Sequence, residues 1–243
     1  MKILVIPDVH LKPRIFERAA GLLNAGAARR AVCLMDIPDD WGQELNLDLY
    51  KKTFDAAIRF QQAFPDTLWC YGNHDLSYLW LRDETGFSPL AINTVNEKLR
   101  KLREALPDDS QLAYIHRIDN VLFLHGGLTH AFVKYYAREE TGDGSLSPND
   151  ETDAVLAKIN SLGRGEMWDD ASPIWYRPQF YGEKMYRESD LLQVVGHTPV
   201  ERIERSGNVL SCDLFSTYRS GAPIGTEEFV VIETETWEYR GVK

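Results

Sequence analysis

Short runs of apolar, often β-branched residues recur along the chain, separated by longer stretches with helical spacing. The runs at 3–6, 31–35, 67–71, 121–124, 191–195 and 229–232 each predict a buried strand. Apolar positions three and four residues apart predict amphipathic helices around 15–23, 45–60 and 95–106. Alternation of strands and helices in the first half of the chain favours an α/β sheet.

The second half of the chain has a different pattern. Residues 114–118 and 121–124 flank Asp119-Asn120 and predict a hairpin, and 209–212 and 229–233 also predict strands, so we expect mixed sheets. Residues 141–150 predict a loop, because they are rich in Gly, Ser, Asp and Pro. A helix with apolar positions from 155 to 162 should follow, with Gly163 as its C-cap. We expect one domain spanning residues 1–243, with a helical cap segment around 141–190.

Composition excludes several classes of protein. The 243 residues include 27 Lys and Arg against 37 Asp and Glu, which gives a net charge of −10. Such an acidic chain is poorly suited to duplex nucleic acid or an anionic membrane surface, and no apolar run has the length of a membrane span. Three cysteines without a CxxC pair predict neither a disulfide framework nor a thiolate zinc site, and favour a reducing, cytoplasmic location.

Polar residues follow five of the predicted strands, where ligands bind in open α/β sheets. Each group alone fits an ordinary turn or a hydrogen-bonded core histidine, although Gly-Asn-His-Asp at 72–75 is more specific. The ordered set favours a metal site. Its members are Asp8 and His10, then Asp36, Asp39 and Asp40, then Asn73, His74 and Asp75, then His125, then His197.

The same residues stand in motifs. In chain order these are Asp8-Val9-His10, Met35-Asp36-Ile37-Pro38-Asp39, Gly72-Asn73-His74-Asp75, His125-Gly126-Gly127 and Gly196-His197-Thr198-Pro199. The series resembles that of the calcineurin-like metallophosphoesterases, and within them the bacterial or phage type of the phosphoprotein phosphatase branch. The resemblance covers residues 8 to about 225. It implies an α/β fold in which a two-sheet β sandwich with mixed sheets is flanked by helices.

The resemblance also implies a centre with two divalent metal ions. Asp8 and His10 would hold the first ion, Asp36 would bridge both, and Asn73, His125 and His197 would hold the second. Oxygen and imidazole ligands of this kind suit manganese, iron or zinc, and we expect manganese. Such a pair of ions can clamp a phosphate and generate a bridging hydroxide that attacks phosphorus.

Three more residues have roles by the same resemblance. His74 would be the general acid for the leaving group, since imidazolium can donate a proton near neutral pH. Asp39 would orient His74, although it could be a plain turn residue, and Asp75 could serve instead. Arg177 would bind substrate phosphate, although it could be a surface arginine; Arg14 is a weaker candidate.

Two departures from the family pattern affect the expected activity. Met35 replaces a glycine and could crowd the bridging Asp36; Asp40 stands where the phosphatase branch usually has a phosphate-binding arginine. We expect hydrolysis of a phosphomonoester, with a serine/threonine phosphoprotein or a phosphorylated small molecule as substrate. The alternatives are a dinucleoside polyphosphate (nucleotide) hydrolase and a metal-free scaffold of the same fold. Aromatic residues near Arg177 could stack on a base or simply pack: Trp168, Trp175, Tyr176, Phe180 and Tyr181.

Overall fold

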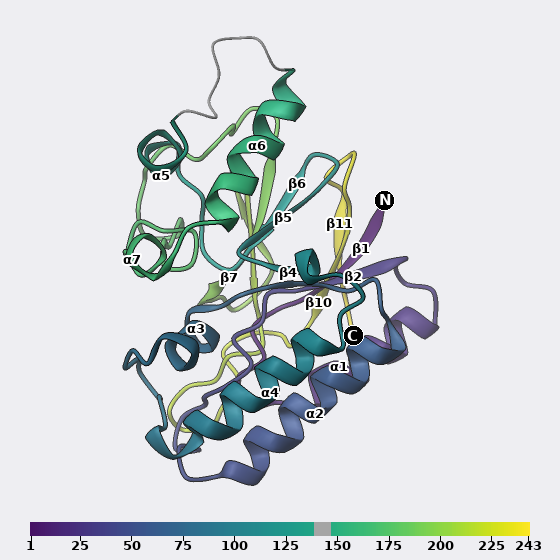
Figure 1. Ribbon diagram of the computed structural model, residues 1–243. Helices are drawn as coiled ribbons and strands as arrows, with labels where there is room; N and C mark the ends of the chain where they lie inside the picture. Colours follow the sequence, from purple (N-terminus) through teal and green to yellow (C-terminus); the bar gives the residue numbers. More distant parts are fainter. Residues whose placement is uncertain (139–146) are drawn as a thin grey trace.

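A computed structural model describes residues 1–138 and 147–243, in which two β-sheets are flanked by helices (Figure 1). The first sheet contains, in spatial order, β11 (Tyr239–Val242), β10 (Phe229–Glu233), β1 (Lys2–Ile6), β2 (Arg30–Cys33), β3 (Leu68–Cys70) and β4 (Leu112–Ala113). The second contains β5 (Ile115–Ile118), β6 (Val121–Leu124), β7 (Leu192–Pro199), β9 (Val209–Asp213) and β8 (Glu204–Ser206). Both sheets mix parallel and antiparallel pairs, as the sequence predicts.

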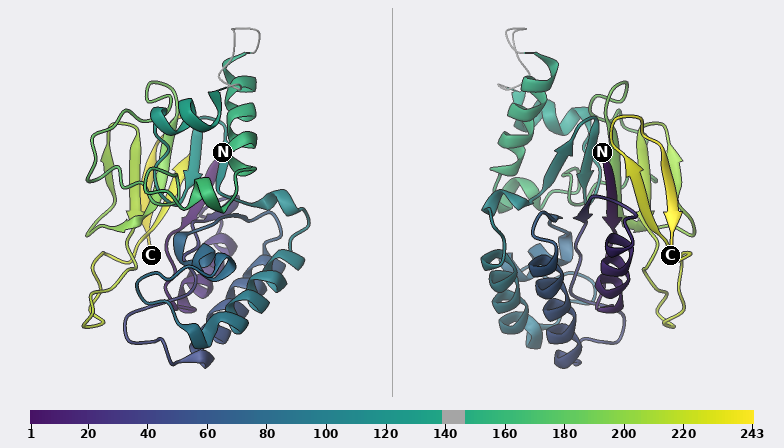
Figure 2. Two further views of the ribbon diagram at one scale, coloured as in Figure 1. Left: turned by 60° about the vertical axis from the view of Figure 1, so that its left-hand side comes forward. Right: turned by 90° about the vertical axis from the view of Figure 1, so that its right-hand side faces the viewer.

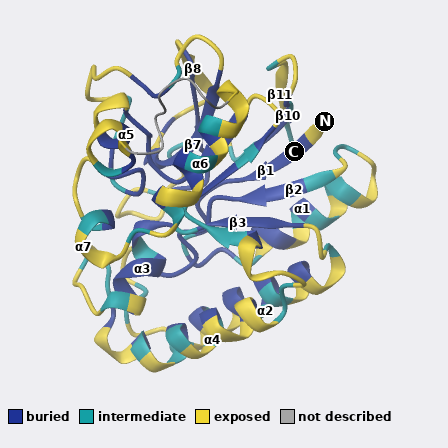
Figure 3. Cartoon of the chain, turned by 45° about the horizontal axis from the view of Figure 1, so that its top comes forward, coloured by how far each residue is buried: buried dark blue, intermediate teal, exposed yellow. Residues whose placement is uncertain are grey.

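Helices cover the outer face of each sheet (Figure 2). The first sheet carries α1 (Arg14–Asn24), α2 (Leu47–Ala63) and α4 (Ile92–Glu104). The second carries α5 (His130–Tyr136), α6 (Pro148–Asn160) and α7 (Arg164–Met167). The remaining elements are α3 (Asn73–Trp80) and the 3-10 turns η1 (Pro89–Ala91) and η2 (Asp109–Gln111). In α2 and α4 the faces turned to the sheet are buried and the outer faces exposed, as their periodicity predicts (Figure 3).

Strand β1 contributes side chains to two separate hydrophobic clusters, one on each face of the first sheet. Ile3 and Val5 belong to a buried cluster that draws side chains from both sheets. Leu4 and Ile6 belong to the cluster beneath α1, α2 and α4. Because successive side chains in a strand point to opposite faces, an apolar run without alternation fits a strand buried on both faces.

The parallel strands bring distant loops together. β1, β2 and β3 are parallel neighbours in the first sheet, and β6, β7 and β9 are parallel neighbours in the second. The loops after β1 and β2 also pair directly, since His10 N donates to Asp36 O at 2.8 Å and Leu11 N donates to Ile37 O at 3.0 Å. These carboxyl ends carry most of the candidate site.

The predicted hairpin is confirmed, with Ile115 opposite Leu124 and Ile118 opposite Val121. The C-cap prediction for Gly163 is wrong: α6 ends at the C-cap Ser161, and Gly163 instead precedes α7 as its N-cap. Residues 141–146 of the predicted loop lie outside the described residues. Residues 148–150 form the first turn of α6, because the Ser147 side chain caps it and a proline suits its first position.

Strand β7 runs four residues beyond its prediction. His197 therefore lies inside the strand, at an irregularity in pairing between Val195 and Pro199, rather than after its end. Among the helices of the described residues, none is both long and apolar enough to cross a bilayer.

Candidate metal centre

Backbone conformation at the strand ends is unusual. His10, Met35, Asp36, Asp39 and His197 all have positive φ, at +41°, +56°, +40°, +66° and +62°. Residues other than glycine rarely adopt this region, and such strain concentrates at functional sites. For Met35 this explains why the family pattern has glycine at the position.

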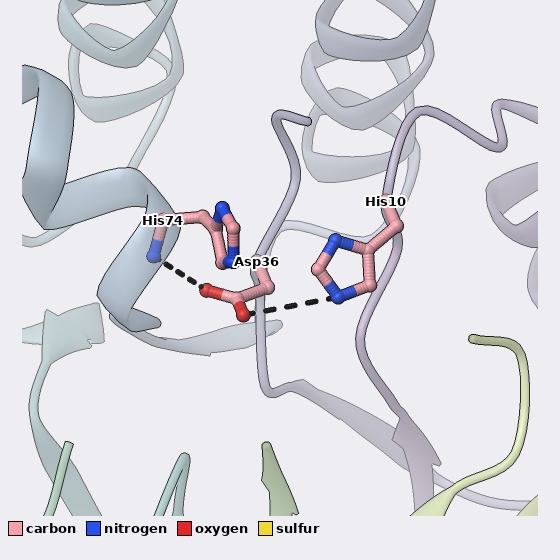
Figure 4. Close-up of side chains that lie close together, drawn as sticks. All are labelled: His10, Asp36 and His74. Carbon is pink, nitrogen blue, oxygen red and sulfur yellow. Dashed lines mark hydrogen bonds and ion pairs between the residues drawn. The ribbon is translucent and has the colours of Figure 1, made fainter. Parts of the chain in front are cut away.

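Asp36 lies at the centre of the cluster. Its Oδ1 accepts the backbone N–H of His74 at 2.9 Å, and its Oδ2 lies 3.9 Å from His10 Nε2 (Figure 4). The same Oδ2 lies 3.1 Å from His125 Nε2. One carboxylate thus faces histidines from three separate segments of the chain.

Two of the histidines are oriented by backbone carbonyls. His125 Nδ1 lies 3.0 Å from Leu34 O, and His10 Nδ1 lies 3.0 Å from Asp39 O. A carbonyl can only accept, so in the neutral form of each imidazole Nδ1 carries the proton and Nε2 keeps the lone pair that a metal ion would bind. Holding the far nitrogen in this way is how proteins orient histidine ligands of metals.

Two glycines allow the carboxylates to approach the backbone. A Cβ on Gly72 would lie 2.0 Å from Asp36 Oδ1, and a Cβ on Gly196 would lie 2.0 Å from Asp8 Oδ1. His197 N donates to the other oxygen of Asp8 at 2.9 Å. Glycine is therefore required at both places, where a side chain would displace a candidate ligand.

The polar groups left without partners fit a cation. Asp8 Oδ1 and His197 Nε2 are both buried without a hydrogen-bond partner, which is costly unless something else satisfies them. Ligand atoms of His10, Asp36 and His74 lie within 4.8 Å of one another, as do those of Asp36, His125 and His197. Asp36 belongs to both groups, and Asn73 Oδ1 lies 3.0 Å from His125 Nε2. Oxygen and imidazole donors shared around one carboxylate fit two divalent ions.

Electrostatics agrees with this fit. Burial, together with the charges of Asp213 and Asp36, raises the pKa of Asp8 well above its usual range. Burial, followed by the neighbouring His125 and Arg177, lowers the pKa of His197. A neutral imidazole is the form that binds a metal, and a cation would offset the cost of an ionised, buried Asp8.

His74 and Asp39 form a pair beside Asp36, with His74 Nδ1 at 2.9 Å from Asp39 Oδ2. Burial lowers the pKa of His74, but the charges of Asp36 and Asp39 outweigh it and raise the pKa to about 9. The imidazole is therefore protonated at neutral pH when no cation competes for Asp36. Asp75 does not share this position, because it accepts the backbone N–H groups of Ile37 and Gly72 instead, each at 3.2 Å.

A pocket of about 300 Å³ opens over the cluster and includes Arg177 in its lining. Arg177 Nη1 donates to His197 O at 2.6 Å and to Thr198 Oγ1 at 3.1 Å, and pairs with no carboxylate of the described residues. The structure does not bring Arg14 to the pocket; Arg14 forms an exposed ion pair with Glu227.

The two departures from the family pattern have structural explanations. The Met35 side chain is fully buried in the core beneath the helices and does not line the pocket, so the expected crowding of Asp36 does not occur. Asp40 does line the pocket, but Lys12 Nζ binds it at 2.8 Å and Thr217 Oγ1 donates to it at 3.0 Å. Asp40 thus lines the pocket with its charge paired to that of Lys12.

Sequence reasoning missed part of the pocket wall. The aromatic residues proposed to stack on a base do not line the pocket: Trp168, Trp175 and Tyr176 pack in the core of the second sheet, while Phe180 and Tyr181 are exposed. Among residues given no role, the lining includes Trp41, Glu84, Asp213, Ser216 and Thr217. Two signals in the sequence could have found most of them: Trp41 lies next to the motif at Asp39, and Asp213, Ser216 and Thr217 lie in one stretch after the motif at His197, at 212–217, which resembles the strand and turn of bacterial and phage family members.

Two facing sheets, outer helices and a central carboxylate ringed by histidines define a metallophosphoesterase architecture. The sequence model described as calcineurin-like phosphoesterase matches residues 1–221, and the chain belongs to that family. Its members hydrolyse phosphoester bonds, generally with divalent metals.

Solved structures support the fold. The chain is similar to a cold-active protein tyrosine phosphatase solved at 1.1 Å, with 18% identity, a TM-score of 0.54, and coverage of 100% of this chain and 78% of that one. It is also similar to the cold-active protein-tyrosine phosphatase of the psychrophile Shewanella sp., with 16% identity, a TM-score of 0.53, and coverage of 100% and 80%. No curated protein matches the chain. At these identities the likeness concerns the fold alone.

Proposed function

We propose that this chain is a phosphomonoesterase with two divalent metal ions, and that manganese is the ion it uses. The observation that carries the proposal is Asp36, which belongs to both groups of candidate ligands. Asp8 and His10 would hold one ion with Asp36, and Asn73, His125 and His197 would hold the other with Asp36. When bound, the two ions would neutralise phosphate charge and activate water for attack on phosphorus.

The chain's own residues would supply the rest of the chemistry. Arg177 lines the pocket and would orient a phosphate oxygen. His74 would hold a proton on Nε2 and give it to the leaving oxygen, which otherwise departs as a poor alkoxide. Asp39 would accept from Nδ1, which fixes the ring and stabilises the imidazolium.

A phosphorylated protein side chain is the substrate class we favour, from the phosphoprotein phosphatase branch. The two solved structures described above are called protein tyrosine phosphatases, which agrees with a phosphomonoester on a protein. Among the described residues that line the pocket, Arg177 is the one arginine or lysine, and a single such cation counts against a substrate with several phosphates such as a dinucleoside polyphosphate.

We further propose that residues 1–243 form a single domain, in which the segment around 141–190 covers one side of the site. Support for the single domain comes from α6, which packs against β5, and support for the cover comes from Arg177, which the same segment carries to the pocket.

Hydrolysis assays test the activity. With added Mn²⁺, purified protein should hydrolyse p-nitrophenyl phosphate and phosphopeptides, and bis(p-nitrophenyl) phosphate and dinucleoside polyphosphates more slowly. EDTA or Asp36→Asn should abolish turnover, while His74→Ala should keep bound metal and lose turnover. Activity that survives both EDTA and Asp36→Asn contradicts the proposal, and loss of metal from His74→Ala would make His74 a ligand.

A further inference from the structure

The oxygen of Asp39 that faces away from His74 is held by two buried tyrosines. Tyr50, on α2, donates its hydroxyl to Asp39 Oδ1 at 2.7 Å, and Tyr78, on α3, donates to the same oxygen at 2.5 Å. Both tyrosines and Asp39 are buried. With His74 Nδ1 on Oδ2, three donors fix the carboxylate.

The direction of these hydrogen bonds is set by the surroundings. The hydroxyl of Tyr78 accepts the backbone N–H of Ser88 at 2.9 Å, so its proton is directed to Asp39. Burial and the charge of Asp39 raise the pKa of both tyrosines, which therefore remain donors. Both hydroxyls thus direct their protons at Oδ1 of Asp39.

Helix α3 carries two of the three donors. His74 and Tyr78 are four residues apart, so they lie on one face of the helix, one turn apart. His74 binds Oδ2 of Asp39 and Tyr78 binds Oδ1. Helix α3 thus supplies one hydrogen-bond donor to each oxygen of the Asp39 carboxylate, and Tyr50 on α2 supplies the third donor.

We infer that Tyr50 and Tyr78 are positioning residues, which hold Asp39 so that His74 can protonate the leaving group. This inference rests on the proposed function. Neither hydroxyl touches a candidate metal ligand among the described residues, so their loss should leave the cations in place.

Phenylalanine substitutions remove only the hydroxyls. For Tyr50→Phe and Tyr78→Phe we expect kcat on phenyl phosphate, a poor leaving group, to fall about tenfold. On p-nitrophenyl phosphate, whose leaving group needs no proton, the fall should be under about twofold. KM and bound manganese should not change. Tyr114→Phe is the matched control, because Tyr114 also donates one hydroxyl bond, at 3.3 Å to Leu162 O, away from the pocket.

A double-mutant cycle separates positioning from general stability. In an Asp39→Ala background, Tyr78→Phe should cause no further loss on phenyl phosphate. The inference is overturned if both substrates lose equally, if the losses multiply in the Asp39→Ala background, or if Tyr114→Phe behaves alike. Absence of manganese-dependent turnover in the wild type would instead overturn the proposed function.

Discussion

Gly72→Ala tests how closely the Asp36 carboxylate packs against the backbone of Gly72. The conformation of Gly72, with φ of −94°, is open to alanine, so any effect comes from the added methyl group. That Cβ would lie 2.0 Å from Asp36 Oδ1, 2.7 Å from its Cγ and 2.8 Å from its backbone nitrogen. Ordinary Cβ contacts begin at 3.4 Å, so the carboxylate must move by about 1.4 Å (from 2.0 to 3.4 Å).

A shift of that size separates Asp36 from His74 N and His125 Nε2, its partners at 2.9 and 3.1 Å. Misplacement by about 1 Å can cost on the order of 100-fold in rate. We therefore expect kcat/KM on p-nitrophenyl phosphate to fall at least about 100-fold, with weaker stabilisation by Mn²⁺ in thermal unfolding. Overpacking should also lower the free energy of unfolding, by roughly 1–3 kcal/mol.

Gly21→Ala is the matched control. Gly21 lies on the exposed face of α1, with nothing within 4 Å of its added Cβ. There the substitution should leave activity unchanged and stabilise the helix by roughly 0.5–1 kcal/mol. If Gly72→Ala keeps activity within about threefold of the wild type, the reasoning that Asp36 is fixed against this glycine is refuted.

Two further predictions concern stability. Burial lowers the pKa of His116 to about 4, while its Nε2 donates to Trp69 O at 3.0 Å. As the pH falls, His116 takes up its proton near pH 6.5 in the unfolded state but only near pH 4 in the folded state. The free energy of unfolding should therefore fall by about 3 kcal/mol between pH 6.5 and 4. Denaturant titrations of His116→Gln should lack this fall, and a pH profile identical to that of the wild type would refute the prediction. Met35→Gly should relieve the positive φ but remove a buried side chain, for a net loss of roughly 1–4 kcal/mol in urea unfolding with turnover at saturating Mn²⁺ unchanged. A large fall in turnover would show a direct role for Met35.

Much of the fold and the site could be predicted because both depend on local patterns. Buried strands such as β1 appear as apolar runs, and the candidate ligands follow directly after them. The helix ends were harder: glycine is commoner after a helix than before one, yet Gly163 precedes α7, because the residues after it form that helix. Residues brought in by tertiary packing leave no sequence signal. In the sequence, Tyr50 and Tyr78 look like ordinary buried positions of two helices. Only the folded structure shows that both hydroxyls donate to Asp39.

A count of bound manganese tests the central claim most directly. Equilibrium dialysis followed by elemental analysis gives the number of Mn²⁺ ions per chain in the wild type and in His125→Ala. We predict about two ions in the wild type and about one in His125→Ala, because His125 belongs to only one of the two groups that share Asp36. A wild type that retains none, or a His125→Ala variant that still binds two, would contradict the account.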